Sequence, residues 1–95
     1  MTFAAIVTFG PDLSRIPEVR PAHRAYLAEL RDAGKLALSG PFGDLRGGMT
    51  IFEAESAADV DHILKNDPYT AAGIFASWEI RPWTIVVARR ELLPE

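Results

Sequence analysis

Two residues of this chain have the types needed to move a proton together, His23 and Asp67. His23 stands four residues before Leu27, a spacing that places both side chains on one face of a helix. A histidine ring on an apolar helix face is costly unless a partner satisfies its nitrogens. Asp67 precedes Pro68, and this pair of residues is typical of a turn. If the fold brings the two side chains together, they form an acid–base dyad that needs no cofactor.

Both residues also have a purely structural interpretation. A core histidine commonly satisfies one ring nitrogen with a backbone carbonyl, and an aspartate before proline commonly bonds backbone amides two residues on. In the functional interpretation, Asp67 accepts a hydrogen bond from His23, fixes the ring tautomer and stabilises the imidazolium. The two roles of Asp67 are compatible, because one carboxylate oxygen can serve the turn and the other the ring.

Ser39, which is followed by Gly40 and Pro41, is interpreted as a pocket residue rather than a nucleophile. The segment lacks the strand–turn–helix elbow that exposes an activated serine. We expect Gly40 to allow the close approach of a ligand or of a partner backbone, and Ser39 to offer one hydroxyl group.

Arg20 and Arg24 flank His23. Most arginines on a helix surface are solvated, but a guanidinium at the helix entrance, such as that of Arg20, suits a carboxylate or phenolate. Tyr69, two residues after Asp67, is the aromatic residue that we expect in the pocket. The other aromatic residues considered are interpreted as core or dimer contacts: Phe75, Trp78 and Trp83.

No metal or cofactor site is expected. His62 and the nearby Asp59 would supply two ligands from one helix, which is too few for zinc. Gly47 and Gly48 lack the helix and the lysine of a phosphate-binding loop, so they indicate a hairpin. The chain has no cysteine, which excludes disulfides, thiolate metal sites and a cysteine nucleophile.

Composition excludes two further classes of partner. The formal net charge of −3 argues against sequence-independent binding to nucleic acid, which needs a basic surface. The first residues lack the basic leader of a signal peptide, and no run approaches the roughly 18 to 20 apolar residues that span a bilayer. We therefore expect a protein of the cytoplasm without nucleic-acid or membrane partners.

The elements that must position these residues follow from hydrophobic periodicity. Strands are predicted over residues 3–9, 35–42, 49–54 and 74–81, with an additional β-rich run over residues 84–88. A 3.6-residue period predicts a helix over about 18–33, ended by Gly34 in a left-handed cap. Ser56 and Asp59 signal the start of a second helix that ends near Asn66. Residues 69–73 are one further turn, and residues 91–95 are a loose tail.

The order β-α-β-β-α-β with an extra C-terminal strand is the ferredoxin-like arrangement, an α+β fold with both helices on one face of an antiparallel sheet. We assign residues 1–95 to a single domain. The other sheet face has no layer to cover it, and 48% of the residues are hydrophobic. We therefore predict a homodimer in which two copies pack sheet to sheet.

Several fragments in this order and spacing resemble the YciI-like (YCII-related) family, over about residues 3–83. The fragments are Arg20-Pro21-Ala22-His23, Tyr26-Leu27, Gly34-Lys35-Leu36, Ser39-Gly40-Pro41, Gly47-Gly48, Asn66-Asp67-Pro68-Tyr69 and Ile80-Arg81-Pro82-Trp83. The resemblance implies a dimeric α+β barrel and a cleft that holds His23 and Asp67 beside Ser39-Gly40-Pro41. It also implies cofactor-free acid–base chemistry, including elimination of hydrogen halide from chlorinated ring compounds.

The leading hypothesis is a small cofactor-free enzyme that catalyses elimination or isomerisation of a small cyclic or anionic compound. His23 would move a proton, Asp67 would orient it, and Arg20 or the backbone at Ser39 and Gly40 would hold an anionic oxygen. The alternative is a non-catalytic dimeric module that binds a small ligand or supports another protein. A cofactor-free monooxygenase on the same architecture ranks lowest, because the motif matches favour the His–Asp family, while the fold alone decides no chemistry.

Overall fold

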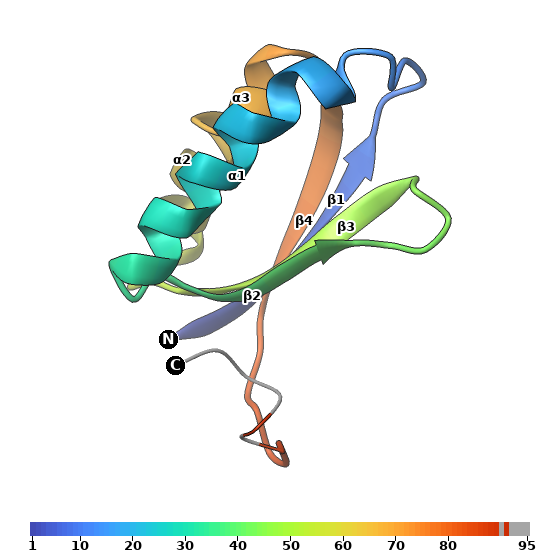
Figure 1. Cartoon of the computed structure of the whole chain (residues 1–95). Helices are drawn as coiled ribbons and strands as arrows, with labels where there is room; N and C mark the ends of the chain where they lie inside the picture. Colours follow the sequence, from blue (N-terminus) through green and yellow to red (C-terminus); the bar gives the residue numbers. More distant parts are fainter. Residues whose placement is uncertain (90, 92–95) are drawn as a thin grey trace.

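The four strands of the chain form one antiparallel sheet in the order β2-β3-β1-β4. A computed structural model describes residues 1–89 and 91. The elements in chain order are β1 (Thr2–Phe9), α1 (Ile16–Asp32), β2 (Leu36–Pro41), β3 (Gly47–Glu53), α2 (Ala57–Lys65), α3 (Pro68–Ala71) and β4 (Phe75–Pro82), as Figure 1 shows. This is the ferredoxin-like α+β order that the sequence predicts.

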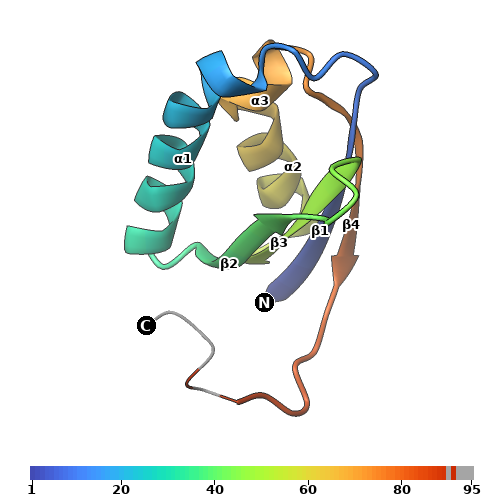
Figure 2. The ribbon, with the colours of Figure 1, turned by 45° about the vertical axis from the view of Figure 1, so that its right-hand side comes forward.

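The helices cover one face of the sheet, and the other face carries no helix of the described residues (Figure 2). Side chains of β1 alternate, so that Phe3, Ala5 and Val7 are buried. These residues pack in one cluster with Phe52 of β3 and with residues of the two longer helices: Leu30, Val60 and Leu64. The buried face of the strand, which repeats every two residues, and the buried faces of the helices, which repeat every 3.6 residues, therefore form a single core.

Helix α1 ends as the sequence predicts. Gly34 adopts a φ of +76°, and the amide of Lys35 donates to the carbonyl of Leu30 at 2.8 Å. The helix begins at Ile16, earlier than expected, so Pro21 lies inside the helix rather than at its start. On this helix His23 lies seven residues before Leu30, on the same face, and its ring contacts Phe75 of β4.

The break between α2 and α3 positions Asp67. Ser56 caps α2 by accepting a hydrogen bond from the amide of Asp59 at 3.2 Å, and the helix gives way at Asn66. Asp67 is then the N-cap of the short helix α3, which begins with Pro68. The predicted further turn is confirmed. Asp67, directly before it, has an extended backbone conformation, and its carboxylate is buried.

Strand β3 begins at Gly47, two residues before the predicted start at residue 49. A Cβ atom at Gly47 would lie 2.1 Å from the carbonyl oxygen of Val7, and one at Gly48 would lie 2.8 Å from the carbonyl oxygen of Gly40. The two glycines were interpreted as part of the hairpin connection. They belong to the strand instead, because only glycine permits this approach of neighbouring backbones.

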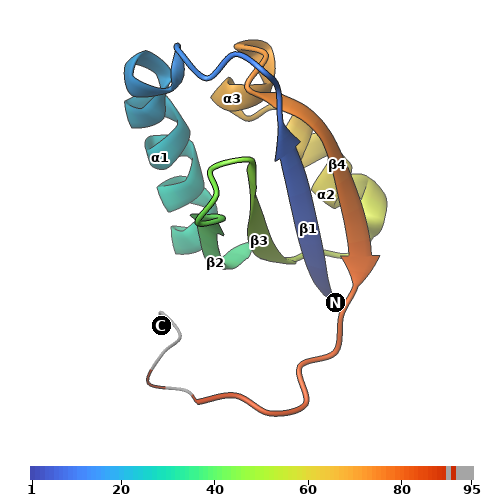
Figure 3. The same cartoon turned by 90° about the vertical axis from the view of Figure 1, so that its right-hand side faces the viewer.

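Residues 84–88, expected as an extra C-terminal strand, form no strand in this chain. The amide of Trp83 donates to the carbonyl of Thr2 at 2.9 Å, and the chain then leaves the sheet (Figure 3). Val86 and Val87 are 86% and 89% exposed. High β-propensity does not make a strand without a neighbouring strand to pair with. Of the predicted tail, residues 92–95 lie outside the described residues.

Trp78 connects β4 to α2. Its indole Nε1 donates to Oδ1 of Asp61 at 2.8 Å, and Lys65 forms an ion pair with the other oxygen of Asp61 at 2.8 Å. Hydrogen bonds from Lys65 and from Trp78 lower the pKa of the Asp61 carboxyl below its ordinary value. The edge strand is therefore held to the helix layer by a polar contact as well as by apolar packing.

Candidate active site

A cavity of about 490 Å³ opens between α1, α3 and the helix-facing side of the sheet. Its walls are mainly apolar, and they include Val7, Phe9, Leu27 and Phe75. Polar side chains from α1, β2, β3 and α3 also line it. The volume lies within the range of cavities that bind small organic molecules.

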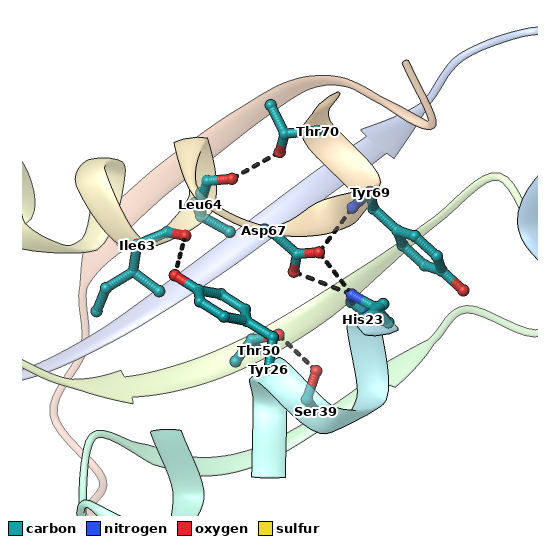
Figure 4. A network of polar contacts seen from close by, with 9 residues as sticks. All are labelled: His23, Tyr26, Ser39, Thr50, Ile63, Leu64, Asp67, Tyr69 and Thr70. Carbon is teal, nitrogen blue, oxygen red and sulfur yellow. Dashed lines mark hydrogen bonds and ion pairs between the residues drawn. The ribbon is translucent and has the colours of Figure 1, made fainter. Parts of the chain in front are cut away.

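His23 and Asp67 meet at the wall of this cavity (Figure 4). The ring nitrogen Nδ1 lies 2.7 Å from Oδ1 and 3.0 Å from Oδ2 of the carboxylate. The side chain of His23 is 14% exposed and that of Asp67 is 3% exposed. Asp67 is the one buried charged residue of the part of the chain that the structure describes. The predicted His–Asp pair is therefore present and shielded from bulk water.

This arrangement determines the state of the imidazole ring. A neutral ring that faces a carboxylate through Nδ1 carries its proton there, which leaves Nε2 as the acceptor. Among residues 1–89 and 91, no group forms a hydrogen bond with Nε2. This nitrogen is not fully buried, and His23 lines the cavity, so Nε2 is accessible from it. The basic lone pair of His23 is thus the part of the dyad that a bound molecule can reach.

Asp67 serves the helix cap and the ring together, as expected, but the same oxygen does both. Oδ1 accepts a hydrogen bond from the amide of Tyr69 at 2.9 Å and also makes the shorter contact with His23. The expected division of one oxygen for each role is wrong, because the N-cap rotamer directs Oδ1 toward the helix amide and the ring alike. Oδ2 completes a bifurcated contact with His23.

Tyr69 stacks on His23. The two ring centroids are 3.7 Å apart with an interplanar angle of 7°. Phe75 contacts both rings edge to face, at 5.6 Å from Tyr69 and 6.0 Å from His23. Such packing restricts rotation of the imidazole about χ2 and adds to the burial of the aromatic side chains.

Two further hydrogen bonds hold the helices that carry the dyad. Tyr26, three residues after His23 on α1, donates its hydroxyl to the carbonyl of Ile63 on α2 at 2.8 Å. Burial raises the pKa of Tyr26, and the nearby negative charges of Asp67 and Glu29 raise it further. Thr70 of α3 donates to the carbonyl of Leu64 at 2.6 Å (Figure 4).

The remaining predicted pocket residues all line the same cavity: Arg20, Ser39, Gly40, Pro41 and Tyr69. The Ser39 hydroxyl lies 2.6 Å from that of Thr50. This pairing gives Ser39 no contact with a base among the described residues, in agreement with its interpretation as a pocket residue. A Cβ atom at Gly40 would meet nothing within 4 Å, so space remains beside this segment of β2.

Sequence reasoning missed several residues that line the cavity, above all Arg24 and Leu45. Arg24 was interpreted as solvated, although its spacing of four from Arg20 places both on one helix face. The arginines that form ion pairs within the described chain are Arg15, Arg31, Arg81 and Arg89. Arg20 and Arg24 are not among them, so two guanidinium groups face the cavity without a carboxylate partner from residues 1–89 or 91.

Phe75, which was interpreted as a core or dimer contact, packs against the core cluster and also lines the cavity beside the dyad. His62 is exposed, and its Nε2 lies 3.3 Å from Nδ2 of Asn66. Within residues 1–89 and 91, no group of three or more His, Cys, Asp or Glu side chains is arranged to hold a metal ion. No helix in the described part of the chain has the length and apolar character needed to cross a bilayer.

Comparisons with known proteins agree on one family. The family model for the YCII-related domain matches residues 1–84. Protein YciI of Escherichia coli O6:H1 and that of Shigella flexneri are each 33% identical over 75 residues, which cover 68% of this chain and 76% of theirs. A solved structure with a TM-score of 0.77 and 32% identity covers 88% of this chain, and 94% of that chain is covered. It is the 5-chloro-2-hydroxyhydroquinone dehydrochlorinase of Burkholderia phenoliruptrix, in complex with 2,5-dihydroxybenzoquinone.

Proposed function

The chain belongs to the YCII-related domain family, and from this premise we propose that it is a small enzyme that performs acid–base chemistry with His23 and Asp67. One observation carries the proposal. The Nδ1 atom of His23 bonds a buried carboxylate, while Nε2 faces a cavity of about 490 Å³. A structural histidine needs the first contact but has no use for an accessible second nitrogen beside a ligand-sized space.

In the proposed reaction, Nε2 of His23 takes a proton from a carbon or oxygen of the bound substrate. The negative charge of Asp67, held 2.7 Å from Nδ1, stabilises the imidazolium that forms. In an elimination, the electron pair of the broken C–H or O–H bond forms a new double bond, the leaving group departs with the electrons of its own bond, and His23 then releases the proton to water. In an isomerisation, His23 returns the proton to another atom. General acid–base catalysis of this kind supplies roughly 100- to 10,000-fold, and positioning supplies the rest.

The walls of the cavity indicate the kind of substrate. Apolar residues such as Phe9, Leu27 and Phe75 suit a ring or another compact apolar body. Arg20 and Arg24 suit an anionic oxygen, such as a carboxylate or phenolate. Ser39 and the backbone at Gly40 lie on β2, across the cavity from α1, and offer additional polar contacts. The dehydrochlorinase among the similar structures supports elimination as the first reaction to test.

A second candidate function is a non-catalytic dimeric module that binds a small ligand or supports another protein. It is favoured by the double role of Asp67, since the carboxylate is already used by the N-cap of α3. The variant Asp67→Asn distinguishes the two functions, with chloride release from chlorinated hydroxyhydroquinones and binding of 2,5-dihydroxybenzoquinone as readouts. An enzyme should retain binding and lose turnover, whereas a binding module shows no turnover in either form.

We further propose that the protein is a homodimer of the cytoplasm. The sheet face opposite the helices is uncovered within one chain (Figure 2). Apolar side chains are also exposed shortly after β4 in the sequence, at Ile85, Val86 and Val87. A second copy packed sheet to sheet would complete the α+β barrel. Light scattering coupled to size-exclusion chromatography tests this, and a mass of one chain at micromolar concentration would reject it.

A further inference from the structure

Leu45, in the loop between β2 and β3, has an unusual backbone conformation. Its φ of +61° makes it the one non-glycine residue with positive φ among those that the structure describes. Residues other than glycine are uncommon in this left-handed region, because Cβ crowds the backbone there. Leu45 nevertheless lines the cavity, and it is 58% exposed.

The backbone on both sides holds Leu45 in this conformation. Its amide donates to the carbonyl of Phe42 at 2.9 Å. The next amide, that of Arg46, donates to Oδ1 of Asp44 at 2.9 Å, and the carbonyl of Arg46 accepts from the amide of Phe9 at 2.8 Å. The loop is therefore fixed to the end of β1, and the strained conformation is imposed by its surroundings.

Glycine would be the residue of lowest cost at position 45. The loop has glycines, but they stand elsewhere: Gly47 and Gly48 permit the close approach of strands, and Gly43 has no contact that requires it. None of these three has a positive φ. A leucine at the strained position contributes nothing to the buried core, since more than half of its surface is exposed. Neither core packing nor backbone conformation therefore accounts for a leucine at this position.

We propose that Leu45 is a binding residue that forms a fixed apolar wall at the mouth of the cavity and covers the apolar body of an anionic ligand. The same cavity is lined by Leu13, in the loop before α1, and by Ile16, the first residue of α1. A ligand between these residues and Leu45 would bury all three, while Arg20 and Arg24 bind its charge. This inference rests on the proposed function only in that the cavity binds a small molecule, and it holds whether or not a reaction follows.

The experiment compares Leu45→Gly, which removes strain and side chain together, with Leu45→Ala, which removes the side chain and keeps the strain. Naphthalenesulfonate serves as the probe, because it combines an apolar ring with one negative charge, and isothermal titration calorimetry measures its affinity. Both variants should bind about tenfold more weakly than the wild type, as expected for the loss of part of a leucine contact. Only Leu45→Gly should raise the Tm, by roughly 4 °C for a domain of this size.

Phe42→Leu is the matched control, since Phe42 is an exposed apolar residue of the same loop that does not line the cavity. It should bind the probe within about twofold of the wild type. Unchanged affinity in Leu45→Gly would overturn the inference, as would a wild type that does not bind the probe. A loss of self-association in Leu45→Ala with unchanged affinity would also overturn it, by assigning the side chain to an interface. None of these results bears on the proton-transfer role of His23, which Asp67→Asn tests separately.

Discussion

Tyr69 contacts both members of the dyad at once: its ring lies parallel to that of His23 at 3.7 Å, and its amide donates to Asp67 at 2.9 Å. One residue in the first turn of α3 therefore fixes the plane of the imidazole and the rotamer of the carboxylate. The geometry of the dyad depends on this turn as much as on the two charged groups themselves. Substitutions at these positions should separate the contributions of charge, stacking and capping.

Asp67→Asn should reduce turnover by about 100-fold or more while α3 remains capped. The amide oxygen can still accept from the backbone, but the buried negative charge that stabilises the imidazolium is lost. Nitrogen-15 NMR of the His23 ring provides a direct readout, because the wild type should show the Nδ1-protonated tautomer of the neutral ring. Asp32→Asn, at an exposed carboxylate near the end of α1, is the control. An unchanged tautomer and turnover in Asp67→Asn would reject the dyad.

Tyr69→Phe should behave like the wild type, whereas Tyr69→Leu should lose the stacking on His23. The lost aromatic contacts are worth about 0.5–1.5 kcal/mol, which lowers the Tm by several degrees in a domain of this size. The upfield ring-current shifts of the His23 carbon-bound protons should also disappear in Tyr69→Leu. If Tyr69→Phe loses activity while its fold is intact, the hydroxyl rather than the ring has the essential role.

Arg24→Gln and Arg20→Gln should weaken binding of an anionic ligand without abolishing proton transfer. Loss of one charge-assisted hydrogen bond of about 1.5–3 kcal/mol predicts a rise in KM of roughly tenfold or more with a smaller change in kcat. Arg31→Gln serves as control, because Arg31 lies in the last turn of α1 and pairs with Asp32. Equal KM values in all three variants would place the ligand anion elsewhere.

Stability should fall in alkaline solution because of Tyr26. Burial raises the pKa of this hydroxyl in the folded protein, so the folded state holds the proton more tightly than the unfolded state does. The stabilisation by this tighter proton binding is fully present below the pKa of Tyr26 in the unfolded chain, about 10. It is lost as the pH rises through the pKa of Tyr26 in the folded protein. Urea unfolding at about pH 8 and pH 11 should show this loss in the wild type and a smaller one in Tyr26→Phe. At about pH 8 the variant should also be about 1 kcal/mol less stable than the wild type, because its hydrogen bond to Ile63 is absent, and this difference should shrink at about pH 11.

The positions of His23 on its helix and of Asp67 at a turn could be predicted because their signals are local, whereas their contact across 44 residues of sequence was implied by the resemblance to the YCII-related family. A helical period places His23 on the face of α1 that meets the sheet, and Pro68 ends the preceding helix, so that Asp67 becomes a cap. Gly34 and Ser56 mark helix ends in the same way, and the structure confirms both. In each case the physical cause lies within a few residues of the chain.

Other features depend on tertiary contacts and leave no such local signal. An apolar residue such as Phe75 has the same pattern whether it faces a core or a cavity. The loop that holds Leu45 in its left-handed conformation is fixed to β1 by the hydrogen bond from Phe9 to Arg46, which joins residues far apart in the sequence. The run at residues 84–88 has strand composition but no neighbouring strand in one chain. The position of Arg24 on the cavity wall likewise follows only from the tertiary structure, because other strands and helices form the rest of that wall.

The start of β1 and the end of β4 lie together, at the opposite end of the sheet from α3 (Figure 1). The cavity residues Leu13, Ile16 and Leu45 lie near the other end of the sheet, where the amide of Phe9 at the end of β1 donates to the carbonyl of Arg46. A purification tag or a surface linker joined to the N-terminus would therefore project away from the mouth of the cavity. The protein can be immobilised through this end for ligand screening, or fused to a carrier, with free access of small molecules to the dyad.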